Sequence, residues 1–310
     1  MEKQIKNNCP NINKVESLVI FQCNCRCLMC SVGNKMNSGS KNNKIRSFDS
    51  IKNDIDKASA MKASEFAFSG GEPTLRKDLP ELVRYARGRG FQVIEIQSNG
   101  RIYANKYYGE KMIKAGVNSF VISLHSCEED INDQIMKAPG AFGEQVQGIR
   151  NLNNSGQSVK INIVITKLNY KHLAEHLLYL SRNFNISEIR LSFILLEGFA
   201  GQSPEKVAVS MKEVSPYLVK ALEVAKDKVN CFVYNIPPCL LQGYEEFVND
   251  LDDLNTYLIG SGFDTYLNQS QKEEKTKPRV CEKCLYNSRC FGVWKKYVQV
   301  FGLKEIKPVL

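Results

Sequence analysis

The sequence predicts an α/β protein with a parallel sheet, followed by a smaller cysteine-rich segment. Short apolar runs alternate with helical patterns six times between residues 17 and 226. The 310-residue chain is 43% apolar and 24% charged, as is typical of a globular protein. Seven of its 11 cysteines gather in two places, the residues around 25 and those around 285. Because that number is odd and the cysteines are clustered, metal or redox chemistry is favoured over a disulfide framework.

The predicted strands are short runs rich in Val, Ile, Leu and Phe, over residues 17–22, 65–68, 91–97, 118–124, 158–165 and 188–193. The predicted helices have apolar residues three and four positions apart, and they cover residues 48–61, 78–87, 106–115, 142–154, 170–183 and 214–226. Such alternation is typical of a parallel sheet with crossover helices, whose strands are buried on both faces.

The alternation breaks after Leu196. Pro237-Pro238, a stretch rich in Gly, Asn and Tyr, and a charged run follow, and the tail is rich in cysteine. We therefore predict three parts: an N-terminal extension over 1–16, the main α/β unit over 17–205, and a smaller unit over 206–310.

Charge and hydropathy narrow the function classes. No run of 18 apolar residues occurs, and the N-terminus lacks the apolar region of a secretory signal, so we expect a cytoplasmic protein without a membrane segment. The net charge of +9 permits an acidic partner such as a peptide, a nucleotide or RNA. A solvated lysine-rich surface explains the same charge.

The first cysteine cluster follows the first predicted strand. Cys23, Cys27 and Cys30 have the spacing Cys-x3-Cys-x2-Cys. Three thiolates on one short loop can hold three corners of a cubane iron–sulfur cluster and leave the fourth iron open to another ligand. Cys25 falls outside this spacing, and we expect it to face away. A closed zinc site is the alternative, but it needs a fourth ligand from elsewhere.

A second motif, Gly70-Gly71-Glu72-Pro73, follows the second predicted strand. Two glycines allow the backbone to approach a ligand closely. A carboxylate held beside them can bind an ammonium group.

Together the two motifs resemble those of the radical S-adenosylmethionine (radical SAM) superfamily, over roughly residues 15 to 200. The resemblance implies a partial (β/α)6 TIM-like barrel. It implies a [4Fe-4S] cluster held by Cys23, Cys27 and Cys30, whose open iron binds the methionine part of SAM. It also implies reductive cleavage of SAM to a 5′-deoxyadenosyl radical that abstracts a substrate hydrogen.

The resemblance extends to further SAM-site residues. Gly70, Gly71 and Glu72 would hold the methionine amino group. Ser98-Asn99-Gly100 is similar to a turn of the family, so Asn99 would line the SAM pocket. Ser123-Leu124-His125 is similar to another family segment, in which Ser123 would face SAM and His125 would face the substrate or the ribose. Met29 stands where an aromatic residue is usual.

Four further cysteines are found in the tail: Cys239, Cys281, Cys284 and Cys290. Four thiolates can hold one iron–sulfur cluster or one zinc ion, and spacing alone does not separate the two. Beside a radical SAM core, the set resembles the auxiliary-cluster domain called twitch, a shortened relative of the SPASM domain. We therefore favour an auxiliary [4Fe-4S] cluster.

Several functions are compatible with these motifs. We favour modification of a ribosomally made peptide by cross-linking, epimerisation or oxidation, with Cys127 as a candidate hydrogen-atom donor. The alternative is a small-molecule dehydrogenase or a carbon-skeleton-modifying enzyme in cofactor or natural-product biosynthesis. Either enzyme would need a low-potential electron donor such as flavodoxin or ferredoxin. A basic zinc-binding protein that contacts nucleic acid is the non-enzymatic alternative.

Overall fold

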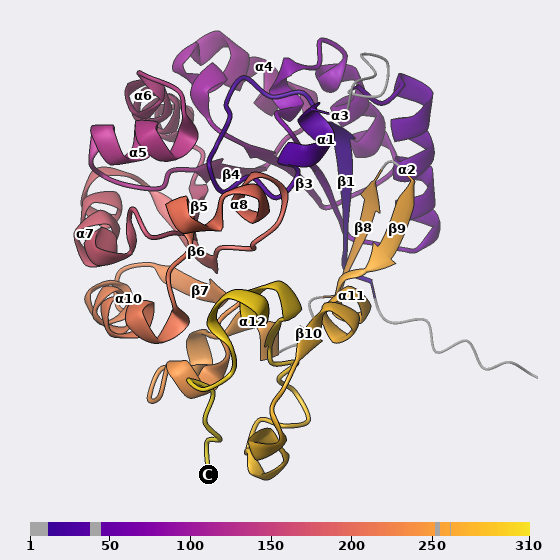
Figure 1. The fold of residues 1–310 in the computed structure, drawn as a ribbon. Coiled ribbons are helices and arrows are strands. Elements are labelled where there is room, and N and C mark those ends of the chain that lie inside the picture. The colour runs from indigo at the N-terminus through magenta and orange to yellow at the C-terminus, as the bar shows by residue number, and fades with distance from the viewer. Residues whose placement is uncertain (1–11, 38–44, 252–254, 261) are drawn as a thin grey trace, which may run out of the picture.

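A computed structural model of the chain describes residues 12–37, 45–251, 255–260 and 262–310. Its main feature is a nine-stranded sheet with the strand order β7-β6-β5-β4-β3-β2-β1-β8-β9. Neighbouring strands run parallel, apart from the antiparallel pair β8 and β9. The sheet curves and helices cover its outer side (Figure 1). In the described residues the sheet ends in two edge strands, β7 and β9, which confirms a partial barrel.

The strands are β1 (Lys14–Ile20), β2 (Glu65–Gly70), β3 (Val93–Ser98), β4 (Ser119–Ser123), β5 (Val159–Ile165), β6 (Ile186–Phe193), β7 (Asn230–Tyr234), β8 (Thr256–Gly260) and β9 (Phe263–Tyr266). The helices are α1 (Gly33–Asn37), α2 (Phe48–Ala60), α3 (Leu79–Gly88), α4 (Lys106–Ala115), α5 (Glu129–Met136), α6 (Ala141–Asn154), α7 (Leu173–Asn183), α8 (Gly198–Gln202), α9 (Pro204–Val207), α10 (Met211–Ala225), α11 (Leu267–Glu274) and α12 (Lys295–Phe301). No helix in these ranges is both long and apolar enough to cross a lipid bilayer.

The helix ends show why these elements form where they do. The Asn105 side chain accepts from the Tyr107 N–H at the start of α4, and Gly116, with φ 122°, ends that helix. At the start of α10, the Ser210 side chain accepts from the Glu213 N–H. Such capping satisfies backbone donors that the first helical turn leaves unpaired.

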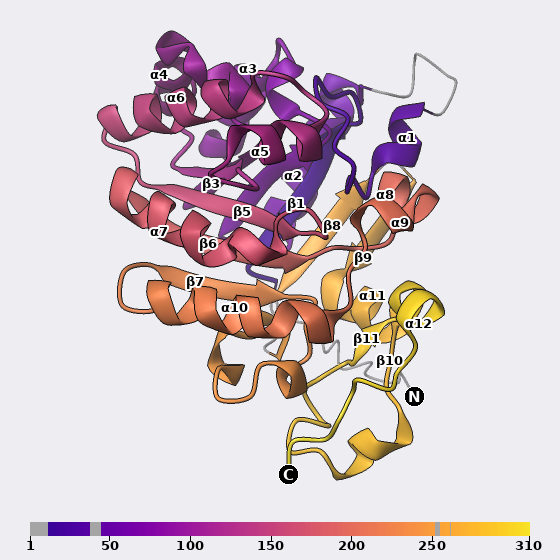
Figure 2. The ribbon, with the colours of Figure 1, turned by 60° about the vertical axis from the view of Figure 1, so that its left-hand side comes forward.

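The tail both extends the main sheet and builds a small one. β7 continues the parallel order after β6, and β8 pairs with β1, so three strands of the segment 206–310 belong to the main sheet. A separate two-stranded sheet of β10 (Lys275–Thr276) and β11 (Val293–Trp294) leads into α12 (Figure 2). The predicted division after residue 205 stays a prediction, because the main sheet runs across it.

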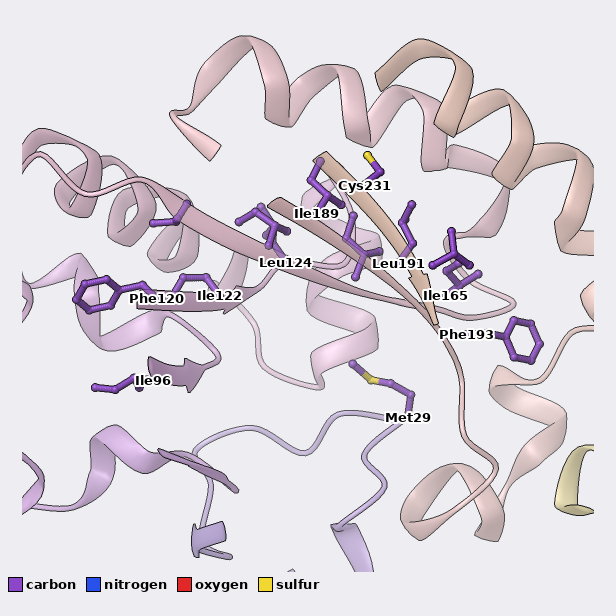
Figure 3. Packing of buried hydrophobic residues seen from close by; sticks show 14 of the residues in the cluster. Met29, Ile96, Phe120, Ile122, Leu124, Ile165, Ile189, Leu191, Phe193 and Cys231 are labelled. Carbon is purple, nitrogen blue, oxygen red and sulfur yellow. The ribbon is translucent and has the colours of Figure 1, made fainter. Parts of the chain in front are cut away.

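The apolar core lies between the strands and the outer helices. β5 shows the pattern most clearly, because Val159, Ile161, Ile163 and Ile165 are fully buried and the residues between them are half-exposed. Figure 3 shows part of this layer, with buried side chains from β3 to β7. Burying one such side chain contributes about 1.5–3 kcal/mol. The alternation leaves the opposite face of the strands for polar residues that line the inside of the barrel.

An ion-pair network lies on the inner side of the sheet. Glu95 on β3 is fully buried, and Lys14 lies 2.6 Å, Lys160 3.3 Å and Arg190 3.5 Å from its carboxylate. Ser119 Oγ donates to Glu95 at 3.0 Å. Burial alone would raise the pKa of the Glu95 carboxyl, but the charges of Lys14, Arg190 and Lys160 outweigh burial and hold that pKa well below its usual range.

Replacing Glu95 by Gln should therefore destabilise the protein by about 3–5 kcal/mol at neutral pH, because three partly buried cations lose the buried carboxylate that they share. The lowered pKa of Glu95 also determines how its contribution to stability changes with pH. The stabilisation by Glu95 is present above the unfolded-state pKa of about 4.3 and is lost as the pH falls toward the folded-state value. Urea unfolding of wild type and Glu95→Gln at pH 7 and pH 3.5 measures both effects. Glu81→Gln on exposed α3 is the control, and equal stability of Glu95→Gln and wild type would contradict the prediction.

Candidate active site

A cavity of about 420 Å³, here called the thiol cavity, opens at the carboxyl ends of the parallel strands. Sites of parallel α/β folds form at this end, because the loops that follow successive strands meet there. The predicted residues that line it are Cys23, Cys27, Cys30, Gly70, Gly71, Asn99, Ser123 and His125. The structure thus brings together most of the site residues predicted from the first two-thirds of the chain.

The side chains of the loop after β1 lie on two sides of that loop. Its four cysteines and Met29 line the thiol cavity, whereas Arg26 and Leu28 line a separate pocket. Two backbone hydrogen bonds hold the loop against the end of α5: Arg26 N–H donates to Met136 O at 3.2 Å, and Leu28 N–H to Ile135 O at 2.8 Å. The thiols that were predicted to act together therefore lie on one side of the loop.

The spacing of the thiols suits a cluster with several metal atoms. Cys30 N–H donates to Cys27 O at 3.1 Å, which closes a tight turn between them. Burial raises the pKa of Cys30 to about 11, so binding of metal there releases a proton. Among the residues described, no three Cys, His, Asp or Glu side chains converge on a point where one metal ion could be held. Ligands of a cubane bind different irons and can therefore lie farther apart.

The prediction that Cys25 faces away from the cavity is wrong. Cys25 lines the thiol cavity, is 3% exposed and packs against Met136, Ala138 and Ala141. The Arg101 guanidinium lies 3.6 Å from its sulfur. Because a thiol is small and largely apolar, Cys25 fills a buried position of the loop that a hydrophobic residue could also fill.

The two glycines pass close to the loop that carries the thiols. Gly70 has φ 122°, and a Cβ on Gly71 would lie 2.3 Å from Gln22 O, which no side chain could accept. Gly71 N–H donates to Ile20 O at 2.6 Å. The glycines therefore allow the β2 end to seat against the β1 end, and they leave backbone atoms exposed to the thiol cavity.

Glu72 is enclosed by hydrogen-bond donors of the chain itself. Its side chain is 1% exposed and is not part of the thiol cavity wall. Oε1 accepts from Thr74 Oγ1 (2.6 Å), Thr74 N–H (3.1 Å) and Ser98 Oγ (2.8 Å), and Oε2 accepts from Asn99 N–H (2.7 Å). Burial raises the pKa of Glu72, and these hydrogen bonds oppose that shift. The structure therefore makes Glu72 a positioning residue that ties the β2 loop to the β3 loop.

Asn99 lies in the loop after β3. Its side chain reaches the cysteine-bearing loop after β1, residues 23–30, here called the thiol loop. Its Nδ2 donates to Asn24 Oδ1 at 2.6 Å and lies 3.9 Å from Cys23 Sγ, while its Oδ1 accepts from Arg101 N–H at 3.1 Å. Gln145 supports it from α6, donating to Asn99 O at 2.9 Å. Asn99 thus lines the thiol cavity beside the first cysteine, and its predicted contact with SAM stays a prediction.

His125 follows β4 and is 2% exposed in the cavity wall. Val164 N–H donates to its Nδ1 at 3.2 Å, so the ring proton is on Nε2. Burial, with a smaller contribution from His176, lowers the pKa of His125 to about 3. His125 is therefore neutral at neutral pH, and its Nε2–H is the group that it can offer to a ligand, as a hydrogen-bond donor rather than a cation.

Cys127 lies two residues beyond His125 but is not among the described residues that line the thiol cavity. Burial raises the pKa of its half-buried thiol, and the charges of Glu128 and Glu175 add to the shift. Glu175 belongs to α7 on the outer side of the sheet. This placement gives no support to the predicted hydrogen-donor role.

The profile described as "Radical SAM superfamily" matches residues 17–180, which is more than half of the chain and includes both the cysteine loop and the two-glycine motif. The chain belongs to the radical SAM superfamily. This confirms the predicted enzyme class and leaves no place for the zinc-binding, nucleic-acid-binding alternative.

Two curated proteins match parts of this radical SAM chain. The Fe-coproporphyrin III synthase of Methanosarcina barkeri is 34% identical over 119 residues, which are 38% of this chain and 29% of that protein. The probable GTP 3',8-cyclase of Metallosphaera sedula is 32% identical over 153 residues, 49% of this chain and 47% of that protein. The chain thus spans less than half the length of either relative.

Solved radical SAM structures resemble the fold over more of the chain. SuiB of Streptococcus suis bound to S-adenosylmethionine has a TM-score of 0.69 at 15% identity, and the match covers 96% of this chain and 76% of that one. The protein anSMEcpe with bound AdoMet has a TM-score of 0.55 at 14% identity, over 70% of this chain and 63% of that one. At these identities the likeness shows the fold.

Radical SAM proteins bind a [4Fe-4S] cluster and SAM, and the thiol cavity fits both. Three soft thiols face it from one loop, the donor type that holds iron–sulfur clusters. Beside them stand glycine backbone atoms at Gly70 and Gly71 and the neutral His125. These groups can bind the amino acid part and the hydroxyl groups of a nucleoside.

The four tail cysteines of the radical SAM chain also lie together. Burial raises the pKa of Cys239 to about 11, and the charges of Cys290, Cys281 and Cys284 add to that shift, as neighbouring thiols do. Two of the sulfurs accept backbone N–H groups, Cys290 from Gly292 at 3.2 Å and Cys284 from Val309 at 3.4 Å. Hydrogen bonds to sulfur tune iron–sulfur clusters, so this donor set fits the predicted auxiliary cluster.

Sequence reasoning missed a second group of residues, which line a lumen cavity of about 520 Å³ between the strands and the tail. Glu16, Gln97, Asn162 and Arg190 line both this lumen cavity and the thiol cavity. The signal was present in the strands, where polar residues recur at every second position. The tail adds Trp294, whose Nε1 donates to Asn235 Oδ1 at 2.9 Å.

Proposed function

We propose that this radical SAM enzyme modifies a ribosomally made peptide, one side chain of which enters the lumen cavity. The observation that carries the proposal is that the lumen cavity and the thiol cavity meet at a junction lined by polar side chains. Residues from β1, β3, β5 and β6 line both cavities, so a group in the lumen cavity lies next to the SAM site.

The charges of the lumen cavity oppose a polyanionic substrate. Its three cationic side chains are already paired, Lys14 and Lys160 with Glu95, and Arg190 with Glu188 at 2.5 Å. The carboxylates on its wall outnumber these cations; they are Glu16, Glu65, Glu188 and Asp250. A triphosphate or a carboxylate-rich porphyrin would lose hydration there without gaining a cation in return. A neutral or cationic side chain of a peptide fits better.

Glu16 is the residue best placed to recognise that side chain. It lies half-buried on β1, and its Oε2 accepts from the amide of Gln97 at 2.9 Å rather than from a cation. Asn162 accepts from Ser192 Oγ at 3.1 Å through its Oδ1, which directs its own amide donors elsewhere. A carboxylate and an amide at the junction can bind an ammonium or hydroxyl group.

The cofactors and the protein have separate roles in the proposed reaction. The cluster held by Cys23, Cys27 and Cys30 would, together with SAM, supply the radical that removes a hydrogen atom, and the four tail cysteines would hold a second cluster with the capacity to take up an electron. The chain itself positions one C–H bond, excludes water and can hold the released proton on Glu16. The tail wall of the lumen cavity, with Trp294 and Asp250, encloses the substrate.

A solved structure of a fold relative supports a peptide as the class of substrate. SuiB, the fold relative that covers 96% of this chain, has also been solved bound to its precursor peptide SuiA. Curated relatives named as acting on GTP match segments of the barrel, over 49–64% of this chain. We keep a small neutral or cationic molecule as the second candidate, because a cavity of about 520 Å³ is also in the range of small-molecule sites. The predicted cytosolic location stays a prediction.

The test uses synthetic peptides encoded by short reading frames beside the gene. Reconstituted enzyme, SAM and a chemical reductant should convert one of them, which then loses the mass of two hydrogen atoms or, for epimerisation, takes up deuterium from D2O. Glu16→Gln should raise the KM for that peptide about tenfold or more, the loss of one charged hydrogen bond. Glu81→Gln on exposed α3 is the matched control. Turnover of GTP, with every peptide left unchanged, would refute the proposal.

A further inference from the structure

A small pocket of about 190 Å³, here called the outer pocket, lies on the far side of the thiol loop. It is lined by Arg26, Leu28, Lys137, Phe199, Gln202, Ser203, Lys206 and Val207. These residues come from the thiol loop, the end of α5, and α8 with α9. Figure 2 shows α8 and α9 beside α1, and α1 contacts α8.

The outer pocket and the thiol cavity lie on opposite sides of the thiol loop. The two have no lining residue in common, although both are lined by members of the segment 23–30. Leu28 in the outer pocket stands between Cys27 and Cys30, which line the thiol cavity. The thickness of a single loop therefore separates a group in the outer pocket from the cluster ligands.

The floor of the outer pocket is fixed to that loop. Phe199 N–H donates to Cys30 O at 2.9 Å. The Phe199 ring lies so close to Gly33 that a Cβ there would be 2.5 Å from it, and a Cβ on Gly198 would be 2.2 Å from Cys30 O. A partner that contacts Phe199 is therefore held at a constant distance from the cluster ligands.

The rim of the outer pocket is positively charged. Arg26, Lys137 and Lys206 are exposed, and no carboxylate is among its described lining residues. Lys137 has φ 49°, a backbone conformation in which glycine or asparagine is usual. Lys167 adds a fourth cation beside α9, where its Nζ lies 3.5 Å from Glu205 O. The α9 helix carries one acidic residue, Glu205, so the four cations outnumber the acidic side chain of that helix.

The size and lining of the outer pocket suit a protein surface rather than a small ligand. Its volume of about 190 Å³ is below the 300–1,000 Å³ that is usual for small-molecule sites. Leu28, Phe199 and Val207 are the apolar residues of its described lining, beside three cationic side chains. Apolar contacts next to charged residues are typical of protein–protein interfaces, in which complementary charges steer the encounter.

We propose that the outer pocket is where an acidic low-potential electron donor, of the flavodoxin or ferredoxin class, docks on this enzyme. The inference rests on the radical SAM chemistry and not on the identity of the substrate. Each encounter passes one electron from the donor's reduced cofactor to the cluster held by Cys23, Cys27 and Cys30, and no atom is transferred. The thiol cavity is taken by SAM and opens to the substrate side, so the outer face of the loop gives the donor a short approach that leaves both in place.

The test measures binding of oxidised flavodoxin to the enzyme by anisotropy, which requires no turnover. The double variant Lys137→Glu/Lys206→Glu should raise the Kd about tenfold or more at low salt, and wild-type binding should weaken as salt is added. The matched control is Lys111→Glu/Lys114→Glu on α4, which makes the same charge change on exposed positions of another helix. Its Kd should equal that of wild type.

A second readout separates docking from chemistry. SAM cleavage driven by photoreduced deazaflavin, a neutral small donor, should be equal in wild type and in Lys137→Glu/Lys206→Glu, whereas cleavage driven by reduced flavodoxin should fall about tenfold or more. An unchanged flavodoxin Kd, or an equal loss in the control variant, would overturn the proposal. Binding of inorganic phosphate that the variant abolishes, with flavodoxin binding unchanged, would instead make the outer pocket a small-anion site. Absence of cleavage with deazaflavin in wild type would count against the radical SAM activity itself.

Discussion

A variant in which Cys23, Cys27 and Cys30 are all replaced by Ala will form no detectable 5′-deoxyadenosine from SAM, under any reductant. These three thiols line one cavity from a single loop. Removing all three leaves Cys25 as the one thiol of that loop, and a single thiolate does not hold a cubane. Without the cluster there is no group to pass an electron to SAM.

Iron content provides the measurement that accompanies activity. Anaerobic reconstitution of wild type should give about eight irons per chain, from two cubanes of four. The triple variant should keep about four, held by Cys239, Cys281, Cys284 and Cys290. A plateau near four irons in wild type would remove the auxiliary cluster from the proposal.

The control replaces two cysteines that lie outside both sets, Cys127 and Cys231. Cys231 is buried on β7 and Cys127 neighbours α7, so neither lines the thiol cavity in the described part of the chain. The double Ala variant should keep both the full iron content and the product chemistry of wild type. Activity surviving in the triple variant would reject the assignment of the ligands. Off-pathway products in the double variant would restore Cys127 as a hydrogen donor.

The sequence predicted elements well wherever local signals and tertiary packing agree. α4 was predicted from residues 106 to 115, as observed, because Asn105 and Gly116 mark its two ends. β1 begins at Lys14, three residues before its predicted start, because Lys14 pairs with the buried Glu95 far along the chain. β8 was missed because it pairs with β1 over a separation of about 240 residues, which no local pattern reports, and β9 in turn pairs with β8.

The polarity of the barrel interior was the larger omission. The strands were interpreted as buried on both faces, yet β5 and β6 alternate, with Lys160, Asn162 and Arg190 on the inner side. Alternation at every second residue is the signature of a strand with two different faces. Its meaning depends on the partial barrel, because only the curvature of the sheet places one face of each strand on the wall of the lumen cavity.

Within the candidate site, motif spacing predicted which residues meet but not which way they point. The Cys-x3-Cys-x2-Cys spacing placed three thiols correctly, and the direction of Cys25 was wrong because it is set by α5 and α6. Glu72 lies in the right loop with its carboxylate turned to four backbone and hydroxyl donors instead of to the cavity. Both outcomes depend on neighbours from other elements, α5 and α6 for Cys25 and the residues Ser98 and Asn99 after β3 for Glu72, which the spacing of one motif does not contain.

Replacing Glu72 by Gln will weaken SAM binding about tenfold or more and lower the free energy of unfolding by about 1–3 kcal/mol. The carboxylate has two accepting oxygens, and donors surround both. A glutamine has one accepting oxygen. If that oxygen faces Thr74 and Ser98, the amide N–H2 meets the Asn99 N–H, two donors without an acceptor between them.

The consequence falls on Asn99. Its backbone N–H loses the 2.7 Å bond that anchors the β3 loop, and its side chain is the group that reaches Asn24 in the thiol loop. The effect therefore travels from a residue outside the cavity wall to two residues beside the cluster ligands. A merely structural role would lower stability and leave the affinity of the remaining folded protein unchanged.

Calorimetric titration of reconstituted protein with SAM, without reductant, separates these cases because no turnover occurs. Thr74→Val is the matched control: it removes one hydroxyl donor to Oε1 and keeps the carboxylate and its bond to Asn99. That variant should change the SAM Kd by much less than Glu72→Gln. Were Glu72→Gln to bind SAM as wild type does, the tie between the β2 and β3 loops would be unnecessary for the cavity. In that case the glycine backbone beside it would have to hold the cofactor unaided.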